Sequence, residues 1–489
     1  MPWFEGSVDE AFAAAATTNK PVFLYWGAVW CPPCHYLREK LFQRPEFLAR
    51  MEEVVPVYLD GDTERAQALG ERYQTKGYPT VIVFDSGGQE VMRIDSMLPV
   101  EQYAAALDTA LDATKPIAEV LAAVDSVGPA AMAPADLNLL AFYAWGQEHG
   151  IELDAAAKAE VFGRLYRETP ESLGLVRSRF LALYLSALGG AGEGGKSAAL
   201  SASDRATLDG DLRRVLAEPR LRNVNLGLLF FESAPTVELL RPEPGPDRSA
   251  LIAALDTAAR AAEADESLTV NDRLGALGAR LALASLVRGE GKPLPPALVE
   301  HVRERIAWAT EEVTDENELQ AVMNVMVGIL VNADLPAEAR DLLTAHMADT
   351  VAPYYYRSYL AGFEEEAGNH QAAVALYRQA WLETEGSATR FRWGSTYLRK
   401  AMTLTPDAVE AVKTDGEGIL ADLLAAPDPF AGGNWSRLQQ VDEALAAWSA
   451  EPGAKAVVAG LRGQIGAACA RFPSEGADSQ GQRCRELAG

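Results

Sequence analysis

The sequence predicts an α/β domain in residues 1–115, followed by an all-helical, repeat-like array in residues 116–489. In the first segment, short apolar runs alternate with helical stretches in the order β-α-β-α-β-β-α, with one added helix at the N-terminus. Strand signals fade after Ile117, and helical periodicity continues between loops rich in Gly and Pro. We expect the boundary at residues 114–116, where Thr-Lys-Pro interrupts the pattern.

Length and composition narrow the class of protein. The 489 residues exceed an ordinary single domain, and a hydrophobic fraction of 48% can bury sizeable cores. The formal net charge of −25 gives a surface that repels phosphate backbones and anionic lipid, so we expect no nucleic-acid partner. No run of about 18 apolar residues occurs, so we expect no membrane insertion. Residues 1–6 carry neither the basic nor the apolar region of a secretory signal.

Local signals predict the first elements. Residues 7–10 form a capping box, which opens a short helix. The apolar run 21–26 is typical of a central strand that is buried on both faces. Cys-Pro-Pro-Cys follows at 31–34 and leads into a helical stretch at 35–51, which Pro45 should kink or divide.

Apolar runs, helical periodicity and turn residues predict the rest of the domain. The expected strands lie at 54–59, 81–84 and 89–94, and the expected helices lie at 63–73 and 100–113. The turn Gly77-Tyr78-Pro79-Thr80 precedes the third strand, and Asp-Ser-Gly-Gly at 85–88 predicts a hairpin.

The second region is predicted to consist of helices separated by Gly- and Pro-rich loops. These loops are expected at 189–195, 242–246, 289–296 and 427–433. Such long helical arrays are often built from repeats.

One helical segment carries a repeat-like pattern. Gly368 marks a turn, and Ala373, Tyr377 and Ala380 share one helix face, which resembles the second helix of a tetratricopeptide repeat. Ala339 precedes Ala373 by 34 residues, which is that family's period. This resemblance covers residues 320–382. Arg357 and Glu364 depart from it, because the family has large apolar groups there, and plain antiparallel helix packing is the alternative.

Cys31 and Cys34 are the residues best suited to carry chemistry. A Cys-x-x-Cys pair at the start of a helix places the first sulfur beside partially positive backbone N–H groups. That polarity stabilises the Cys31 thiolate as a nucleophile, and Cys34, one turn further on, can close a disulfide with it. Pro32 and Pro33 lack N–H groups, a loss that early helix positions tolerate.

The surroundings of the pair point to a known family. Trp30 precedes the pair, a buried strand leads into it, a helix follows, and Gly-Tyr-Pro-Thr stands further along the chain. This combination resembles the thioredoxin superfamily, with the closest pattern in the C-terminal periplasmic domain of bacterial thiol–disulfide interchange proteins. The resemblance covers residues 2–115 and implies a thioredoxin fold with a cis bond at Pro79. It implies catalytic roles for Cys31 and Cys34, and a redox-active disulfide with no other cofactor.

The expected substrate site lies around the pair. Trp30, Tyr78 and Pro79 would form an apolar lip, along which an extended client segment could pair with backbone groups. Packing alone is the alternative role for these aromatic side chains.

One position departs from the family pattern. Many relatives carry a buried acid six residues before the first cysteine, whereas this sequence has Tyr25 there. Because tyrosine is a poor base at neutral pH, Asp60, Asp62 or Glu39 could take over the proton of the second thiol, or water could.

Other interpretations of the motif need groups that the sequence does not supply. With His35 the motif also fits Cys-x-x-Cys-His, the haem attachment pattern, but a buried strand leads directly into it. His35 is expected on the helix surface. A zinc site would need two more ligands, so we expect no metal.

Two further cysteines, Cys469 and Cys484, lie in a short polar tail. We predict a structural disulfide between them, which favours a periplasmic or otherwise extracytoplasmic location. Two free thiols and a cytoplasmic location are the alternative.

The predicted function is thiol–disulfide exchange with protein thiols and disulfides, with reduction as the expected direction and a redox partner that recycles the Cys31–Cys34 pair. The helical region would position clients or partners. The alternative is a chaperone or scaffold whose thioredoxin-like domain mainly recognises unfolded segments.

Overall fold

The computed structural model describes residues 1–63, 65–94, 98–113, 115–193, 200–289, 291–472 and 480–488. The predicted boundary at 114–116 therefore lies partly outside the described residues.

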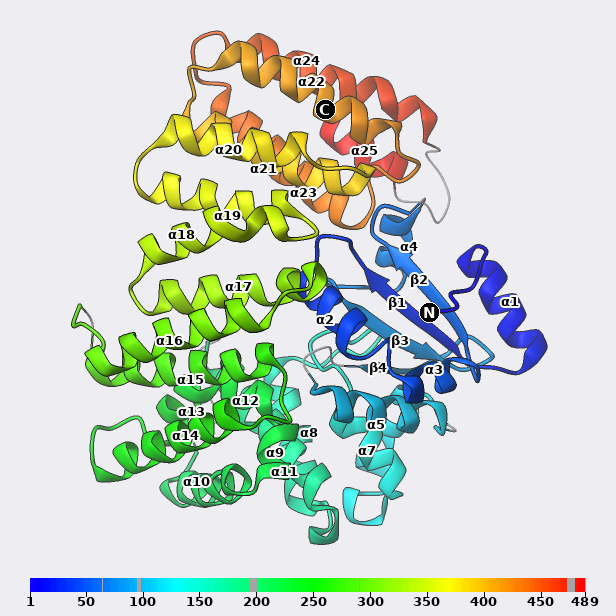
Figure 1. Cartoon of the computed structure of the whole chain (residues 1–489). Helices are drawn as coiled ribbons and strands as arrows, with labels where there is room; N and C mark the ends of the chain where they lie inside the picture. Colours follow the sequence, from blue (N-terminus) through cyan, green and yellow to red (C-terminus); the bar gives the residue numbers. More distant parts are fainter. Residues whose placement is uncertain are drawn as a thin grey trace. The chain divides into compact units, whose positions relative to one another are not determined.

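The N-terminal region contains one four-stranded sheet with the strand order β2-β1-β3-β4 (Figure 1). Its strands are β1 Val22–Gly27, β2 Val55–Asp60, β3 Thr80–Phe84 and β4 Glu90–Ile94. Every residue of β1 is buried, as expected for an apolar central strand, and β3 pairs antiparallel with β4. The thioredoxin fold predicted from the sequence is thus confirmed.

Five helices accompany the strands within residues 1–113. They are α1 Val8–Thr18, α2 Pro32–Lys40, α3 Pro45–Met51, α4 Ala66–Arg72 and α5 Val100–Leu111. The Ser7 side chain and Glu10 form the predicted capping box of α1. The predicted helix 35–51 is divided, and Pro45 occupies the first position of α3, where its missing N–H costs nothing.

The rest of the described chain is helical. The first half holds α6 Ile117–Ser126, α7 Pro134–Phe142, α8 Ala155–Glu168, α9 Gly174–Glu193, α10 Ala202–Ala217, α11 Pro219–Val224, α12 Leu226–Phe231, α13 Ser233–Leu240, α14 Pro246–Ala264 and α15 Val270–Arg288. The second half holds α16 Pro296–Glu312, α17 Glu316–Asn332, α18 Pro336–His346, α19 Pro353–Glu366, α20 His370–Leu382, α21 Ser387–Leu404, α22 Val409–Ala425, α23 Gly432–Trp448, α24 Ala454–Ala468 and α25 Gln480–Ala488.

The predicted loops are wrong in part: α14, α16 and α23 begin inside the ends of the loops 242–246, 289–296 and 427–433, and the loop 189–195 differs most. Residues 189–193 continue helix α9, and residues 194–195 lie outside the described residues. Glycine lowers helix stability by only about 1 kcal/mol per residue, so a helix can run through such a stretch.

The chain divides into two compact units. Unit 1 comprises residues 1–25, 32–58 and 79–339, and unit 2 comprises residues 26–31, 59–78 and 340–489. The segment that carries Trp30 and Cys31 therefore belongs to the same unit as the C-terminal helices. A domain boundary at residue 115 stays a prediction.

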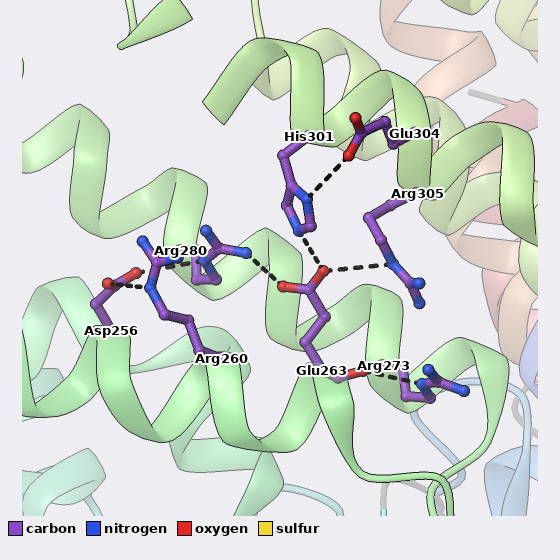
Figure 2. Close-up of polar contacts among 8 residues, drawn as sticks. All are labelled: Asp256, Arg260, Glu263, Arg273, Arg280, His301, Glu304 and Arg305. Atoms are coloured by element: carbon purple, nitrogen blue, oxygen red, sulfur yellow. Dashed lines mark hydrogen bonds and ion pairs between the residues drawn. The ribbon is translucent and has the colours of Figure 1, made fainter. Parts of the chain in front are cut away.

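Unit 1 contains a buried ion-pair network between helices α14, α15 and α16 (Figure 2). The Glu263 carboxylate is 6% exposed and lies 2.5 Å from Arg280, 2.5 Å from His301 and 3.3 Å from Arg305. Arg273 donates a hydrogen bond to the Glu263 carbonyl. Because a buried charge is costly when it is unpaired, this network ties the three helices to one carboxylate.

The repeat-like segment 320–382 is divided between the two units after Ala339, and its second part, with α19 and α20, lies in unit 2. Ala373, Tyr377 and Ala380 are all buried on α20, which packs against α19. Arg357 pairs with Glu383 instead of filling an apolar position. Helix pairs of this kind agree equally with a tetratricopeptide array and with plain helix packing, so the repeat family stays a prediction.

Candidate active site

The candidate site begins where β1 ends and α2 begins. Cys31 immediately precedes α2, which starts at Pro32, and Cys34 lies in its first turn. All four cysteines of the chain are disulfide-bonded. One bond joins Cys469 to Cys484, so the other joins Cys31 to Cys34. Once reduced, the Cys31 sulfur would be stabilised as a thiolate by the N-terminus of α2.

Both sulfurs of the pair are shielded from solvent. Cys31 is 1% exposed and Cys34 is 4% exposed. Attack by a protein client therefore requires the surroundings of Cys31 to open.

Trp30 is held by helices of unit 2. Its Nε1 donates a hydrogen bond to Thr389 Oγ1 at 3.2 Å. Its ring stacks on Tyr355 with 5.9 Å between centroids, and Trp393 packs edge-on at 5.1 Å. The Arg392 guanidinium lies 4.3 Å from the ring centroid. These contacts leave Trp30 only 7% exposed, although the sequence predicted a substrate lip.

Tyr78 packs beside Trp30. The Tyr78 ring stacks on Trp26 at 5.4 Å and meets Trp30 edge-on at 5.3 Å, and Gln67 donates to its hydroxyl. Burial raises the pKa of Tyr78, so its hydroxyl stays protonated. The structure thus brings Trp30 and Tyr78 together, whereas Pro79 is buried and belongs to unit 1.

A hollow of about 840 Å³ opens within unit 2 beside these aromatic side chains. It is lined by Trp30 and Tyr78 together with Arg392 of α21 and Arg437 of α23. Thr389, Arg392 and Arg437 were not predicted as site residues from the sequence. No local motif marks them, because they reach the site only through the packing of helices more than 350 residues away.

The acids proposed to replace the missing buried acid have other partners. Asp62 accepts hydrogen bonds from the N–H and the hydroxyl of Thr389, at 2.7 and 2.5 Å, and so caps the N-terminus of α21. Burial raises the pKa of Asp62. Gly386 precedes α21 at φ 80°, and a Cβ there would clash with this carboxylate. Burial also raises the pKa of Glu39, which accepts a hydrogen bond from Gln43.

Tyr25 is buried at 4% exposure and donates a hydrogen bond to the carbonyl of Cys34 at 3.5 Å. Its ring packs against Tyr58 and Phe42. Tyr25 therefore contacts the backbone of the second cysteine as a packed aromatic group.

The expectation for His35 is wrong. His35 is 2% exposed and lies 3.0 Å from the side-chain oxygen of Asn317 on α17, because α2 packs against α17 within unit 1. Tyr36 donates to Asp272 at 3.3 Å and Lys40 pairs with Glu318. A helix that is covered on this face has no surface position for His35.

The Cys469–Cys484 disulfide joins the residue after α24 to α25, and Cys484 is fully buried. Next to it, Arg483 pairs with Glu71 at 2.6 Å. The Cys469–Cys484 disulfide thus helps to fix Arg483, which pairs with Glu71 of α4.

The described residues show neither a membrane-spanning helix nor a metal-binding cluster. None of their helices combines the length and the apolar character needed to cross a bilayer. They also contain no cluster of three or more His, Cys, Asp or Glu side chains arranged to hold a metal ion.

A sheet in this order, with a disulfide at the start of the helix after its central strand, defines a thioredoxin-fold protein. A family model for the thioredoxin-like domain matches residues 8–111. The chain is 31% identical over 87 residues to thioredoxin-like protein slr0233 of Synechocystis, which covers 18% of this chain and 78% of that protein. The chain therefore belongs to the thioredoxin-like family.

Other relatives match over the same domain. Thioredoxin Y, chloroplastic, of rice (Oryza sativa subsp. japonica) is 33% identical over 98 residues, which cover 20% of this chain and 55% of that protein. Thiol:disulfide interchange protein DsbD of Ralstonia nicotianae is 34% identical over 107 residues, covering 21% of this chain and 18% of that protein. The chain thus spans only part of these relatives. Its N-terminal domain is homologous to thiol–disulfide oxidoreductases.

Proposed function

We propose that this protein is a thiol–disulfide oxidoreductase that reduces disulfides of protein clients through Cys31 and Cys34. The observation that carries the proposal is the disulfide between these residues at the N-terminus of α2, inside a thioredoxin-like domain. A helix N-terminus stabilises a thiolate at that place, which is what nucleophilic exchange requires.

The exchange would proceed in two steps. The Cys31 thiolate attacks one sulfur of a client disulfide, forming a mixed disulfide and releasing a client thiolate, which takes up a proton. The Cys34 thiolate then attacks the Cys31 sulfur, forming the Cys31–Cys34 bond and releasing the second client thiolate. Two electrons pass from the cysteine pair to the client. A separate dithiol partner would restore the reduced pair.

Access to Cys31 would be controlled by unit 2. Cys31 is 1% exposed and directly follows Trp30 in the chain, so we infer that the contacts of Trp30 with Thr389, Tyr355 and Trp393 limit the reaction of Cys31 with a client. We infer that the helical region, with a tetratricopeptide-like part at 320–382, positions clients at this opening together with Trp30, Tyr78 and Pro79.

We place the protein in the periplasm or another extracytoplasmic compartment. The support is the second disulfide, Cys469–Cys484, since oxidising compartments preserve such bonds. Trapping free thiols in intact cells would test this: free Cys469 and Cys484 thiols would contradict the location.

An insulin-type reduction assay tests the proposed activity. We expect the wild-type chain to reduce the substrate with dithiothreitol as donor, and Cys31→Ser to abolish this turnover. Cys34→Ser should accumulate mixed disulfides on Cys31, which mass spectrometry would identify. Cys469→Ser/Cys484→Ser is the matched control and should retain turnover. Activity that is independent of Cys31 would refute the proposal.

A second candidate function is binding of unfolded clients without redox turnover. The burial of Cys31 favours it, because a chaperone needs no accessible sulfur. It predicts that Cys31→Ser suppresses aggregation of an unfolded client as well as the wild type does, while neither protein accelerates reduction of insulin.

A further inference from the structure

The hollow beside Trp30 carries a charge opposite to that of the chain. Its charged lining residues are four basic side chains and one acidic side chain, namely Lys76, Arg392, Arg437, Arg483 and Glu71. Glu71 is already neutralised by Arg483, at 2.6 Å. The chain as a whole has a formal net charge of −25. A local excess of positive charge on so acidic a protein indicates a binding site for a negatively charged group.

Two of these arginines have no acidic partner within the part of the chain that the structure describes. No described carboxylate forms an ion pair with Arg392 or Arg437, and Arg392 instead lies over the rings of Trp30 and Trp393. Among the other arginines of unit 2, Arg378 pairs with Asp415, Arg390 with Asp422, Arg462 with Asp442 and Arg483 with Glu71. Arg392 and Arg437 therefore hold unused donors beside the hollow.

The electrostatic surroundings of Arg437 favour the binding of an anion. Burial, and then the neighbouring charges of Arg392 and Arg399, lower the pKa of Arg437 to about 9. Burial also lowers the pKa of Arg392. Arg437 still carries its charge at neutral pH. A bound anion would relieve the repulsion between these guanidinium groups.

A third donor borders the hollow. Asn434 is 2% exposed, and its buried Nδ2 has no hydrogen-bond partner among the described residues. A buried donor without a hydrogen bond lowers stability by about 1–3 kcal/mol, so buried donors are usually satisfied by an acceptor. Asn434 lies in the first turn of α23, where backbone N–H groups and the helix dipole add positive polarity.

We propose that this hollow is the client-specificity subsite of the protein, where Arg392, Arg437 and Asn434 bind carboxylates that flank the client disulfide. The inference rests on the proposed function, because it assumes that Cys31 reacts with client disulfides. Cys31 directly follows Trp30, which lines the hollow. The proposed subsite assigns the substrate class as acidic polypeptide segments.

The size and lining of the hollow favour a peptide over an inorganic anion. Its volume of about 840 Å³ exceeds what a single small anion fills, and Trp26, Trp30 and Tyr78 offer apolar surface for the rest of a side chain or backbone. Arginine forks bind carboxylates through two parallel hydrogen bonds, which matches this chemistry.

The kinetic test uses two disulfide peptides of equal length, one with Glu and one with Gln beside each cysteine. We expect the reduced full-length protein to react with the acidic peptide about tenfold faster. Arg392→Gln/Arg437→Gln should bring this ratio close to one. Arg485→Gln removes the same charge from an exposed position outside the hollow and should keep the ratio. Measurable but equal rates for the two peptides in the wild type, or an unchanged ratio in the double variant, would overturn the subsite.

A binding measurement separates this inference from the proposed function. The oxidised protein is titrated with the same peptides carrying Ser in place of Cys, and tryptophan fluorescence reports binding without any exchange. Tighter binding of the acidic peptide, lost in the double variant, supports the subsite even where neither disulfide peptide is reduced. Equal binding of both peptides, or inorganic phosphate binding with no peptide preference, overturns it.

Discussion

The indole Nε1 of Trp30 donates a hydrogen bond to Thr389 Oγ1 at 3.2 Å, across 359 positions of sequence. The same hydroxyl donates to Asp62 at 2.5 Å. One threonine thereby links the residue before Cys31, the loop after β2 and the first turn of α21. The proposed active site is consequently shaped by the C-terminal helices as well as by the thioredoxin-like domain.

Removal of the Thr389 hydroxyl should weaken this link. Thr389→Val leaves the Trp30 indole and the half-buried Asp62 carboxylate each short of one partner, so we expect a loss of about 2–3 kcal/mol in the free energy of unfolding. Thr389→Ser keeps the hydroxyl and should lose less than about 1 kcal/mol. Denaturant titration followed by tryptophan fluorescence measures both; equal losses would argue against the hydrogen bonds.

The aromatic cover of Trp30 should limit access to Cys31. Aromatic pairs contribute about 0.5–1.5 kcal/mol, so Tyr355→Ala or Trp393→Ala should accelerate reduction of the Cys31–Cys34 disulfide by dithiothreitol up to about tenfold. Trp308→Ala, on α16 in unit 1, is the control and should leave the rate unchanged. A rate that stays constant in all three variants would mean that the cover does not govern access.

The network around Glu263 should be important for the stability of unit 1 (Figure 2). Glu263→Ala leaves Arg280, which is 5% exposed, without its 2.5 Å partner, so we expect a loss of about 3–5 kcal/mol. Glu304 contacts His301 at 3.6 Å from an exposed position, and Glu304→Ala should cost less than about 0.5 kcal/mol. Similar losses for both variants in thermal unfolding would contradict a buried network.

The Glu71–Arg483 pair should make stability depend on pH. Hydrogen bonds from Arg483, and then from the Gly432 N–H, hold the pKa of Glu71 below its usual 4.5. A lowered pKa of an acid stabilises the fold above 4.5, and this contribution is lost as the pH falls through the lowered value. Because the pair is partly exposed, Glu71→Gln should cost only about 0.5–1 kcal/mol at pH 7.

The difference between wild type and Glu71→Gln should shrink to zero in acid, as measured by denaturant titration from pH 7 downward. Glu417→Gln changes the same charge at an exposed position and should show no such convergence. A constant difference at every pH would mean that the carboxylate charge is not what stabilises this contact.

Local patterns were enough to predict the order of strands and helices in the N-terminal domain, the division of the second helix at Pro45 and the cysteine pair, and the family resemblance implied the thioredoxin fold. Each of these depends on residues within a few positions: apolar runs form buried strands, and proline cannot continue a helix. They did not predict the burial of His35, because its Asn317 partner lies 282 positions away.

The surroundings of the cysteine pair were decided by packing between helices that are distant in the sequence. The burial of Cys31 and the cover over Trp30 depend on which helices meet. So does the grouping of Arg392, Arg437 and Asn434 around one hollow. Single arginines on separate amphipathic helices look like ordinary surface charges in a sequence. They become a candidate site only when the fold partly buries their guanidinium groups and places no carboxylate beside them.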